Sequence, residues 1–288
     1  MAAQTLMLFV DGLGWGVPNP AGNPLYSGAC PNLAKLLEND AQPIDAHLGI
    51  PGAPQSATGQ AALLTGQNAP VFMGRHVEGL PGPRLKELVA GHNILRELAR
   101  RGYRAAFANA YYTDDVEEVR GRRRQSVTTV AALSAGAIRT TAHMVRHKAV
   151  YQDLTRESLR ERGYEGPLVT PAESARDLRA IAAENDFTLF EYFQTDRAGH
   201  SGDPDLVRRV LGRLDELVAG SLEFVASPGR RLILTSDHGN IEDPSTRGHT
   251  GNPVPFIALG AAAGWLKEKV RALTDIAPAL LEEYPPKD

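Results

Sequence analysis

Carboxylates and imidazoles stand beside short apolar runs at four places in this 288-residue chain. Three Asp and three His share this placement: Asp11 after LMLFV, Asp196 and His200 after FEYFQ, Asp237 and His238 after LIL, and His249 just before VPFI. In an open α/β sheet, ligands bind at the carboxyl ends of the strands, so these side chains are expected to form one cluster. The set suits Mn²⁺, Zn²⁺ or Mg²⁺, and two ions are favoured because six groups exceed the need of one site.

Each member of this set also has an ordinary structural explanation. Asp196 could cap a helix, His249 could be a loop histidine, and Asp11 could hydrogen-bond its own turn. Asp237 and the following glycine are typical of a chain turning after a strand. The spacing of Asp196 and His200 allows both side chains to face one ion across a single helical turn. The shared placement favours a metal site over six unrelated structural roles.

A hydroxyl suited to nucleophilic chemistry occurs in the stretch GIPGAPQSATGQAALLTG (49–66). This glycine- and proline-rich loop presents Ser56 at the start of a helix-like apolar run. The positive end of the helix dipole would favour an alkoxide and nearby anionic oxygens, and coordination to a divalent ion would lower the hydroxyl pKa further. Ser56 could instead be a plain N-cap, and Thr58 is a second hydroxyl two residues later.

Composition excludes several classes of function. Hydrophobic residues make up 42% of the chain, charged residues 23%, and the net charge is −3, which suggests neither a nucleic-acid nor a membrane partner. The start MAAQTLMLFVDG has no basic segment and too short an apolar run for a signal peptide, and no other segment is apolar enough to span a membrane. Cys30 is the only cysteine, so an internal disulfide and a thiolate metal cluster are excluded. A reducing cytoplasm is the expected compartment.

The elements that would position these residues alternate along the chain. Apolar runs without polar alternation predict strands buried on both faces, as in a parallel sheet, at residues 5–12, 103–110, 187–194, 231–237 and 254–260. Capping signals and amphipathic spacing predict helices at residues 93–102, 170–184 and 203–225. The sequence therefore predicts an α/β fold with a mostly parallel sheet and helices on both of its faces.

Residues 111–167 break this rhythm. The segment is strongly charged, contains EEVRGRRRQ, and is predicted to be a small inserted cap on a metal-binding catalytic core formed by residues 1–110 and 168–288. Six basic side chains are candidates for contacts to an anionic substrate: Arg75, His76, Arg120, Arg122, Arg123 and Arg124. The arginine run could equally be a solvated surface, and nucleic-acid binding would require a broader basic surface than the net charge suggests.

Taken together, the motifs resemble those of the alkaline phosphatase superfamily, within it the branch of cofactor-independent phosphoglycerate mutase and phosphopentomutase. DGLGWG is similar to the mutases' DGWG, SATGQ to SEVGH, TDRAGHSGD to PDMVGHTG, TSDHGN to TADHGN, GHTGNPVPFI to AHTTNLVPFI, and LTDIAPALLEEY to LSDIAPTLLEL. VYQDLTRES (150–158) echoes a VYQDLTRI segment that lies much sooner after the nucleophile in the mutases.

The resemblance implies an alkaline-phosphatase-like fold and a division of ligands. One ion would be held by Asp196, His200 and His249, and the other by Asp11, Asp237, His238 and the oxygen of Ser56. It also makes Ser56, rather than Thr58, the counterpart of the phosphorylated serine. This sequence departs from the mutase pattern at Gln60, where the motif has histidine, and in its much smaller insertion.

The expected activity is metal-dependent phosphoryl transfer through a phosphoserine, acting on a small phosphorylated substrate. Hydrolysis is favoured over the mutase reaction because a small cap would hold a dephosphorylated product less well. Sulfatase chemistry is disfavoured, since SATGQ lacks the Pro and Arg pattern of that branch. A metal-binding module without catalysis is a further alternative, although none of the expected ligands has been lost.

Overall fold

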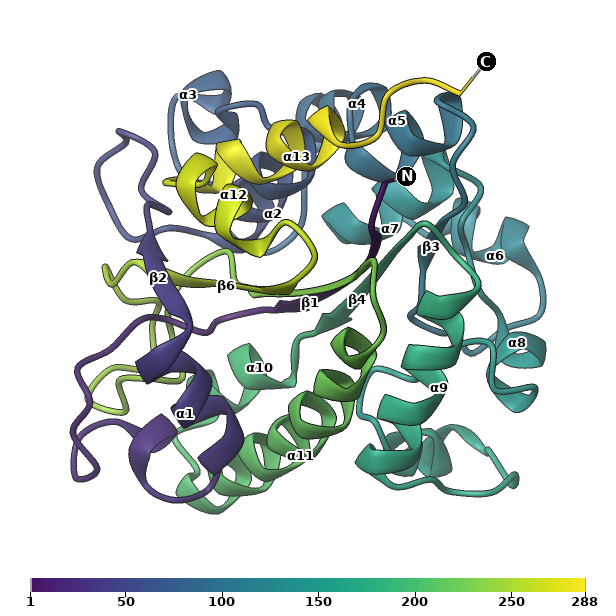
Figure 1. Ribbon diagram of the computed structural model, residues 1–288. Coiled ribbons are helices and arrows are strands. Elements are labelled where there is room, and N and C mark those ends of the chain that lie inside the picture. The colour runs from purple at the N-terminus through teal and green to yellow at the C-terminus, as the bar shows by residue number, and fades with distance from the viewer. Residues whose placement is uncertain (1, 288) are drawn as a thin grey trace.

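The computed structural model describes residues 2–287. Six strands form one sheet in the order β2-β6-β5-β1-β4-β3, with β1 near its middle (Figure 1). The strands are β1 (Gln4–Val10), β2 (Ala41–Ile44), β3 (Ala105–Phe107), β4 (Phe187–Tyr192), β5 (Arg230–Thr235) and β6 (Val254–Gly260). All five predicted strands are confirmed, β6 with the predicted bounds and the other four shorter than predicted, and β2 is an edge strand that the sequence did not predict.

Strand directions explain how one edge of the sheet collects the candidate residues. β1 pairs in parallel with β4 and β5, and β3 pairs in parallel with β4. β6 runs antiparallel to β5, and β2 antiparallel to β6. The amino end of β6 therefore lies at the same edge as the carboxyl ends of β1, β4 and β5. The mostly parallel α/β fold is confirmed, and His249 reaches the cluster by preceding an antiparallel strand.

The sheet is covered on both faces by helices whose apolar sides it buries (Figure 1). Along β1, Met7 and Phe9 belong to one apolar cluster, whereas Leu6, Leu8 and Val10 belong to the other. The first cluster includes buried residues of α2 (Ser56–Thr65), α4 (Pro83–Gly91), α5 (Ile94–Arg100), α7 (Val127–Ser134) and α13 (Leu273–Glu282), and the second those of α1 (Pro31–Asn39), α9 (Pro171–Ala183) and α11 (Pro204–Leu222). This separation by alternate residues is what a strand buried on both faces requires.

The helices begin where the sequence signals predict. Thr170 accepts a hydrogen bond from the backbone of Glu173, whose carboxylate in turn binds the backbone of Thr170, a capping box at the start of α9. The α-helices are α1 (Pro31–Asn39), α2 (Ser56–Thr65), α3 (Ala69–Met73), α4 (Pro83–Gly91), α5 (Ile94–Arg100), α6 (Val116–Gly121), α7 (Val127–Ser134), α8 (Thr141–Val145), α9 (Pro171–Ala183), α10 (Gln194–Ser201), α11 (Pro204–Leu222), α12 (Ala263–Lys269) and α13 (Leu273–Glu282). Three 3₁₀ turns complete the set: η1 (Pro24–Tyr26), η2 (Glu157–Arg162) and η3 (Glu223–Ala226).

The predicted cap, residues 111–167, contains α6, α7, α8 and η2. Helix α7 lies in the main core, because Val127 and Ala131 share an apolar cluster with Phe9 of the central strand. A separate small cluster joins Met144, Leu159 and Tyr164 to neighbouring buried residues. The segment thus contributes to the core as well as forming its own cluster, and its boundaries as a domain stay a prediction.

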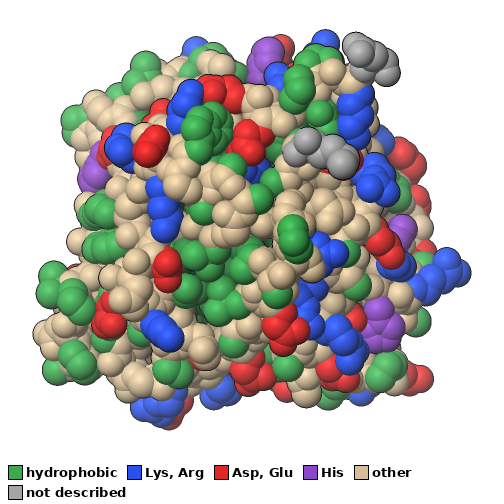
Figure 2. Space-filling model, viewed as in Figure 1, with side chains coloured by type: hydrophobic (Ala, Val, Ile, Leu, Met, Phe, Trp, Pro, Cys, Tyr) green, Lys and Arg blue, Asp and Glu red, His purple; other side chains and the backbone are tan. Residues whose placement is uncertain are grey.

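Surface charge is mixed on the face drawn in Figure 2, where Lys and Arg side chains are interspersed with Asp and Glu. Arg120 of α6 and the C-cap residue Arg122 pair with Glu117 and Glu118 of that helix, at 3.0 and 2.7 Å. Within residues 2–287, no helix combines the length and the hydropathy that crossing a membrane requires.

Candidate metal centre

Each candidate ligand is placed by the end of a strand or by the first turns of a helix. Asp11 directly follows β1, and its backbone N–H donates to the Tyr192 carbonyl at 3.0 Å, extending the β1–β4 pairing. Asp237 and His238 follow β5, both fully buried. The next residue after Asp11, Gly12, has a φ of +72° and lies so close to Asp196 that a Cβ would be 2.9 Å from its Cα. Glycine is required there by both the turn and the contact.

Two short helices present the remaining groups at the same edge. Helix α10 starts just after β4 and carries Asp196 in its first turn and His200 in its last, so that their side chains lie on one face, 3.3 Å apart. Ser56 is the first residue of α2, a helix buried along nearly its whole length. Gln55 is the N-cap residue, so Ser56 does not serve as the cap.

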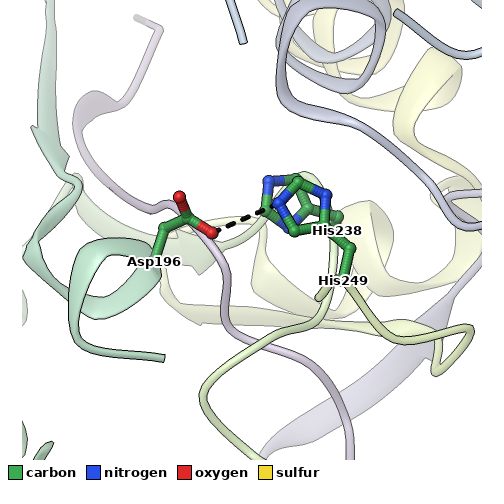
Figure 3. A group of neighbouring side chains, drawn as sticks. All are labelled: Asp196, His238 and His249. Carbon is green, nitrogen blue, oxygen red and sulfur yellow. Dashed lines mark ion pairs between the residues drawn. The ribbon is translucent and has the colours of Figure 1, made fainter. Parts of the chain in front are cut away.

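The structure brings all seven predicted residues into one cluster. His238 Nε2 lies 2.9 Å from the Ser56 Oγ, 3.1 Å from Asp11 Oδ1 and 3.6 Å from Asp237 Oδ2. The His238 ring stacks on that of His249, with centroids 3.7 Å apart. His249 Nε2 in turn lies 3.4 Å from Asp196 Oδ1 and 3.2 Å from His200 Nε2. Figure 3 shows the Asp196 carboxylate directed toward the two stacked rings.

All three imidazoles present the same nitrogen to this cluster. The Nδ1 atoms of His200, His238 and His249 each face a backbone carbonyl, those of Arg247, Gly239 and Pro54, at 2.5, 3.3 and 3.0 Å. Because a carbonyl only accepts hydrogen bonds, Nδ1 carries the proton in the neutral ring and Nε2 presents its lone pair. This second contact is typical of histidines that ligate metals.

Two of the three carboxylates of the cluster, Asp11 and Asp237, have oxygens that lack the partners that buried charges need. Among the described residues, Asp11 Oδ1 and both carboxylate oxygens of Asp237 are buried without a hydrogen-bond partner. Burial and then the neighbouring Asp11 raise the pKa of Asp237 well above its usual range. Such groups are costly unless a cation offsets them, so this donor set fits divalent metal ions.

For the His238 imidazole and the Asp196 carboxylate, neighbouring groups outweigh the effect of burial on the pKa. Burial, the largest single influence, lowers the pKa of His238, but Asp237 and Asp11 outweigh it and raise the pKa to about 10. Burial, again the largest single influence, raises the pKa of Asp196. Its contact with His249, the charge of His238 and a hydrogen bond from Asn240 outweigh burial and lower the pKa of Asp196 to about 2. In the absence of cations, protons bound to Asp237 and His238 thus offset part of the negative charge of the three aspartates.

Two groups of ligand atoms lie close enough together to hold one ion each: Asp11, Asp237 and His238, and Asp196, His238 and His249. His238 belongs to both groups by distance, and His200 lies beside the second. The structure supports two neighbouring positions, while the division of ligands implied by the resemblance stays a prediction.

Three polar residues that sequence reasoning did not assign also shape the site. Gln60, which stands where the mutase motif has histidine, donates to Asp11 Oδ2 at 3.1 Å. Asn240 donates to Asp196 Oδ1 at 2.7 Å, and Thr195 donates to the Asp11 carbonyl at 2.5 Å. Asn240 belongs to the DHGN motif, so its place beside Asp237 and His238 in the sequence could have predicted a role in the site.

The other candidates for anion binding lie outside this contact network. Arg75, Arg123 and Arg124 are exposed, and Arg120 and Arg122 form the ion pairs described above. His76 contacts the Ile50 carbonyl at 3.2 Å. In the described part of the chain, no hydrogen bond or ion pair joins these six side chains to the seven clustered ones. Their contact with a substrate stays a prediction.

Comparison with known proteins agrees with this arrangement. A family model described as "Metalloenzyme superfamily" matches residues 3–285. The 2,3-bisphosphoglycerate-independent phosphoglycerate mutase of Cereibacter sphaeroides is 36% identical over 119 residues, covering 39% of this chain and 23% of the mutase. The corresponding mutase of Natronomonas pharaonis is 32% identical over 125 residues, or 25% of its length. The chain therefore matches only about a quarter of these curated relatives.

Solved structures of similar fold cover the whole chain. The PH0037 protein from Pyrococcus horikoshii has a TM-score of 0.62 and 15% identity, covering 100% of this chain and 98% of that one. The alkaline phosphatase from the Antarctic bacterium TAB5 has a TM-score of 0.56 and 12% identity, with 99% of each chain covered. The alkaline-phosphatase-like fold that the sequence motifs implied is confirmed.

Proposed function

Since the chain belongs to the Metalloenzyme superfamily, we propose that it is a two-metal phosphoryl-transfer enzyme that hydrolyses a small phosphate ester through a phosphoserine at Ser56. The observation that carries the proposal is the convergence of three histidine Nε2 atoms, three aspartates and the Ser56 hydroxyl at one edge of the sheet. Hard oxygen and imidazole donors around an open position are the usual ligands of Mn²⁺ and Zn²⁺.

The residues proposed to hold the cations follow from the cluster. Asp11, Asp237, His238 and the Ser56 oxygen would hold one, and Asp196, His200 and His249 the other. When bound, divalent cations would offset the charge of a substrate phosphate and favour the alkoxide form of the Ser56 hydroxyl.

Ser56 supplies the nucleophile. Its Oγ lies 2.9 Å from His238 Nε2 at the amino end of α2, where the helix dipole favours negative charge. Attack of Oγ on phosphorus forms an Oγ–P bond and breaks the ester P–O bond, and the proton lost by Ser56 balances the one gained by the leaving alcohol. Water then cleaves the Oγ–P bond, returning a proton to Ser56 and releasing inorganic phosphate.

A phosphomutase is the second candidate, supported by the 36% identity to the mutases. The same phosphoserine would then return its phosphate to another hydroxyl of the substrate. Hydrolysis is preferred because the predicted cap, residues 111–167, is small and offers little protein with which to retain a dephosphorylated product. Release of inorganic phosphate separates the two reactions.

The test compares Ser56→Ala with the parent on p-nitrophenyl phosphate in the presence of Mn²⁺. Turnover should fall at least about 1,000-fold in the variant, and a chelator should abolish it in the parent. Thr58→Ala is the matched control, because Thr58 Oγ1 donates to the Gln55 carbonyl at 3.3 Å and accepts from Val77 N at 3.1 Å. Equal turnover by Ser56→Ala and the parent would refute the covalent route.

A broader screen identifies the substrate class. Phosphomonoesters, phosphodiesters and sugar phosphates are compared with Mn²⁺ or Zn²⁺ present, and both inorganic phosphate and transferred phosphate are measured. Metal uptake without turnover of any of them would favour the non-catalytic metal-binding module.

A further inference from the structure

Glu242 is a buried carboxylate just beyond the DHGN motif, only 2% exposed. Its two oxygens accept four hydrogen bonds. Oε2 accepts from the backbone N–H of Gly14 at 3.0 Å and of Asn240 at 2.7 Å. Oε1 accepts from Thr250 Oγ1 at 2.5 Å and from Asn252 Nδ2 at 3.0 Å. A carboxylate is suited to this position because all four partners are donors.

These four donors come from two loops that carry clustered residues, the loop after β1 and the connection between β5 and β6. Gly14 lies in the loop after β1, three residues from Asp11. Asn240 follows Asp237 and His238 after β5, and Thr250 is next to His249 before β6. One side chain therefore ties both ends of the β5–β6 connection to the loop after β1, which is remote from them in sequence.

The glycines of two motifs are explained by the same side chain. A Cβ on Gly14 would lie 2.1 Å from Glu242 Oε1, and one on Gly239 would lie 2.4 Å from the same oxygen. A Cβ on Gly16 would lie 3.1 Å from Glu242 Cγ. DGLGWG and DHGN thus keep glycine where their backbones approach Glu242, since any larger residue at Gly14 or Gly239 would overlap it.

The same hydrogen-bond network also reaches helix α10, a further segment that carries proposed ligands. Asn240, whose backbone N–H is held by Glu242, donates through its side chain to Asp196 Oδ1 at 2.7 Å and to the Asp196 carbonyl at 3.2 Å. Helix α10, which carries Asp196 and His200, is thereby connected to the same carboxylate through one residue.

We infer that Glu242 is a positioning residue that sets the spacing between the two proposed cation positions by holding the loop after β1 and both ends of the β5–β6 connection in register. It contacts none of the seven ligands directly and does not bind the metal. The inference rests on the proposed two-metal centre. Residues behind the ligands commonly change metal affinity or activity by about 10- to 100-fold when they are altered.

The experiment measures Mn²⁺ binding and the electron paramagnetic resonance spectrum of the loaded protein. Glu242→Gln replaces one acceptor oxygen by an NH₂ group that faces two donors. We expect Mn²⁺ affinity to fall about 10- to 100-fold and the signal of a spin-coupled Mn²⁺ pair to be replaced by that of isolated ions. Glu242→Asp, which keeps the charge, should retain more of the coupled signal.

Asp215→Asn is the matched control. Asp215 is buried and accepts hydrogen bonds from Leu33 N and Asn32 Nδ2, both at 2.8 Å, but it joins α11 to α1 away from the cluster. This variant should lower thermal stability without altering Mn²⁺ affinity or the coupled signal. It separates loss of a buried carboxylate in general from loss of the one that holds the ligand loops.

Gly14→Ala covers the case in which Glu242→Gln does not fold. This variant keeps the Glu242 carboxylate, but its added methyl group displaces that carboxylate, so the coupled signal should again be lost. A Mn²⁺ pair and affinity within twofold of the parent in either folded variant would overturn the inference. Failure of the parent itself to bind a Mn²⁺ pair would instead overturn the proposed two-metal function, and the inference with it.

Discussion

Two buried carboxyl groups near this sheet edge, those of Asp237 and Glu191, differ in their hydrogen bonding. Asp237 has no hydrogen-bond partner on either oxygen, whereas Glu191 at the end of β4 accepts from Thr128 Oγ1 at 2.6 Å. An unpartnered buried carboxyl costs stability unless a ligand compensates it. The stability lost by burying the unpartnered Asp237 carboxyl is explained if this residue binds a cation. Glu191 has a hydrogen-bond partner in Thr128, and its protonation depends on pH.

Glu191 leads to a prediction about stability and pH. Burial, opposed by the Thr128 hydrogen bond and aided by Asp11, raises the pKa of Glu191 from 4.5 to about 8. The folded chain therefore keeps this proton more tightly than the unfolded chain. Its stabilising effect is complete below pH 4.5 and is lost as the pH rises toward about 8.

The measurement is the free energy of unfolding of the metal-free protein between about pH 5 and pH 8. We expect Glu191→Gln to flatten its decline with pH, by at most about 1.4 kcal/mol per pH unit, the limit for one proton. Chelator is kept in every sample, so that metal binding does not contribute. Parallel curves for the parent and the variant would contradict the raised pKa.

At the scale of elements, α2 and α10 are held against the sheet by close backbone contacts rather than by long side chains. A Cβ on Gly59 of α2 would lie 2.8 Å from the Asp237 carbonyl oxygen, and one on Gly199 of α10 would lie 2.3 Å from Asn240 Oδ1. Both helices can therefore bring their functional residues to the strand ends only because glycine occupies the contact.

Gly59→Ala should separate activity from helix stability. Alanine favours a helix more than glycine does, but its methyl group would push α2, and with it Ser56, away from Asp237. We expect kcat/KM for p-nitrophenyl phosphate to fall by about 10- to 100-fold in a protein that still folds.

Gly212→Ala in α11 is the control for that change, because the nearest atom to its Cβ would be the Ala29 carbonyl oxygen at 3.8 Å. It should leave kcat/KM unchanged and raise the free energy of unfolding by up to about 1 kcal/mol. Full activity of Gly59→Ala would show that the contact with Asp237 does not position Ser56.

For the whole molecule, the sheet gathers at one edge negative charge that the folded chain does not balance. Three aspartates meet there, and protons shift toward Asp237 and His238 in response. A cation that binds this edge only in the folded state would stabilise the entire fold by mass action.

Metal removal should accordingly lower the melting temperature. At a free Mn²⁺ concentration about 100 times the dissociation constant, the expected gain in the free energy of unfolding is about 2.7 kcal/mol. Thermal melts with chelator and with increasing Mn²⁺ measure this change. Asp237→Asn should lose most of the shift, and an unchanged melting temperature of the parent at saturating Mn²⁺ would contradict the proposed site.

The sequence alone predicted five of the six strands, the fold class and the seven residues that cluster. Apolar runs and capping signals depend on neighbouring residues, so they predict an element without knowledge of the rest of the chain. The motifs around Asp11, Ser56 and Asp237 are also short contiguous segments, so they predict functional residues without knowledge of the rest of the chain. The edge strand β2 was missed because AQPI has neither an apolar run nor a clear period.

Only the tertiary structure decided how these elements meet. The antiparallel pairing of β6 with β5, the carbonyls that hold Nδ1 of His200 and His249, and the hydrogen bond from Gly14 to Glu242 all join segments that are distant in sequence. No local pattern contains such contacts, because each needs two or more strand ends to be brought to one edge first. The position of a catalytic group can be local, but its orientation is set by partners that only the folded chain supplies.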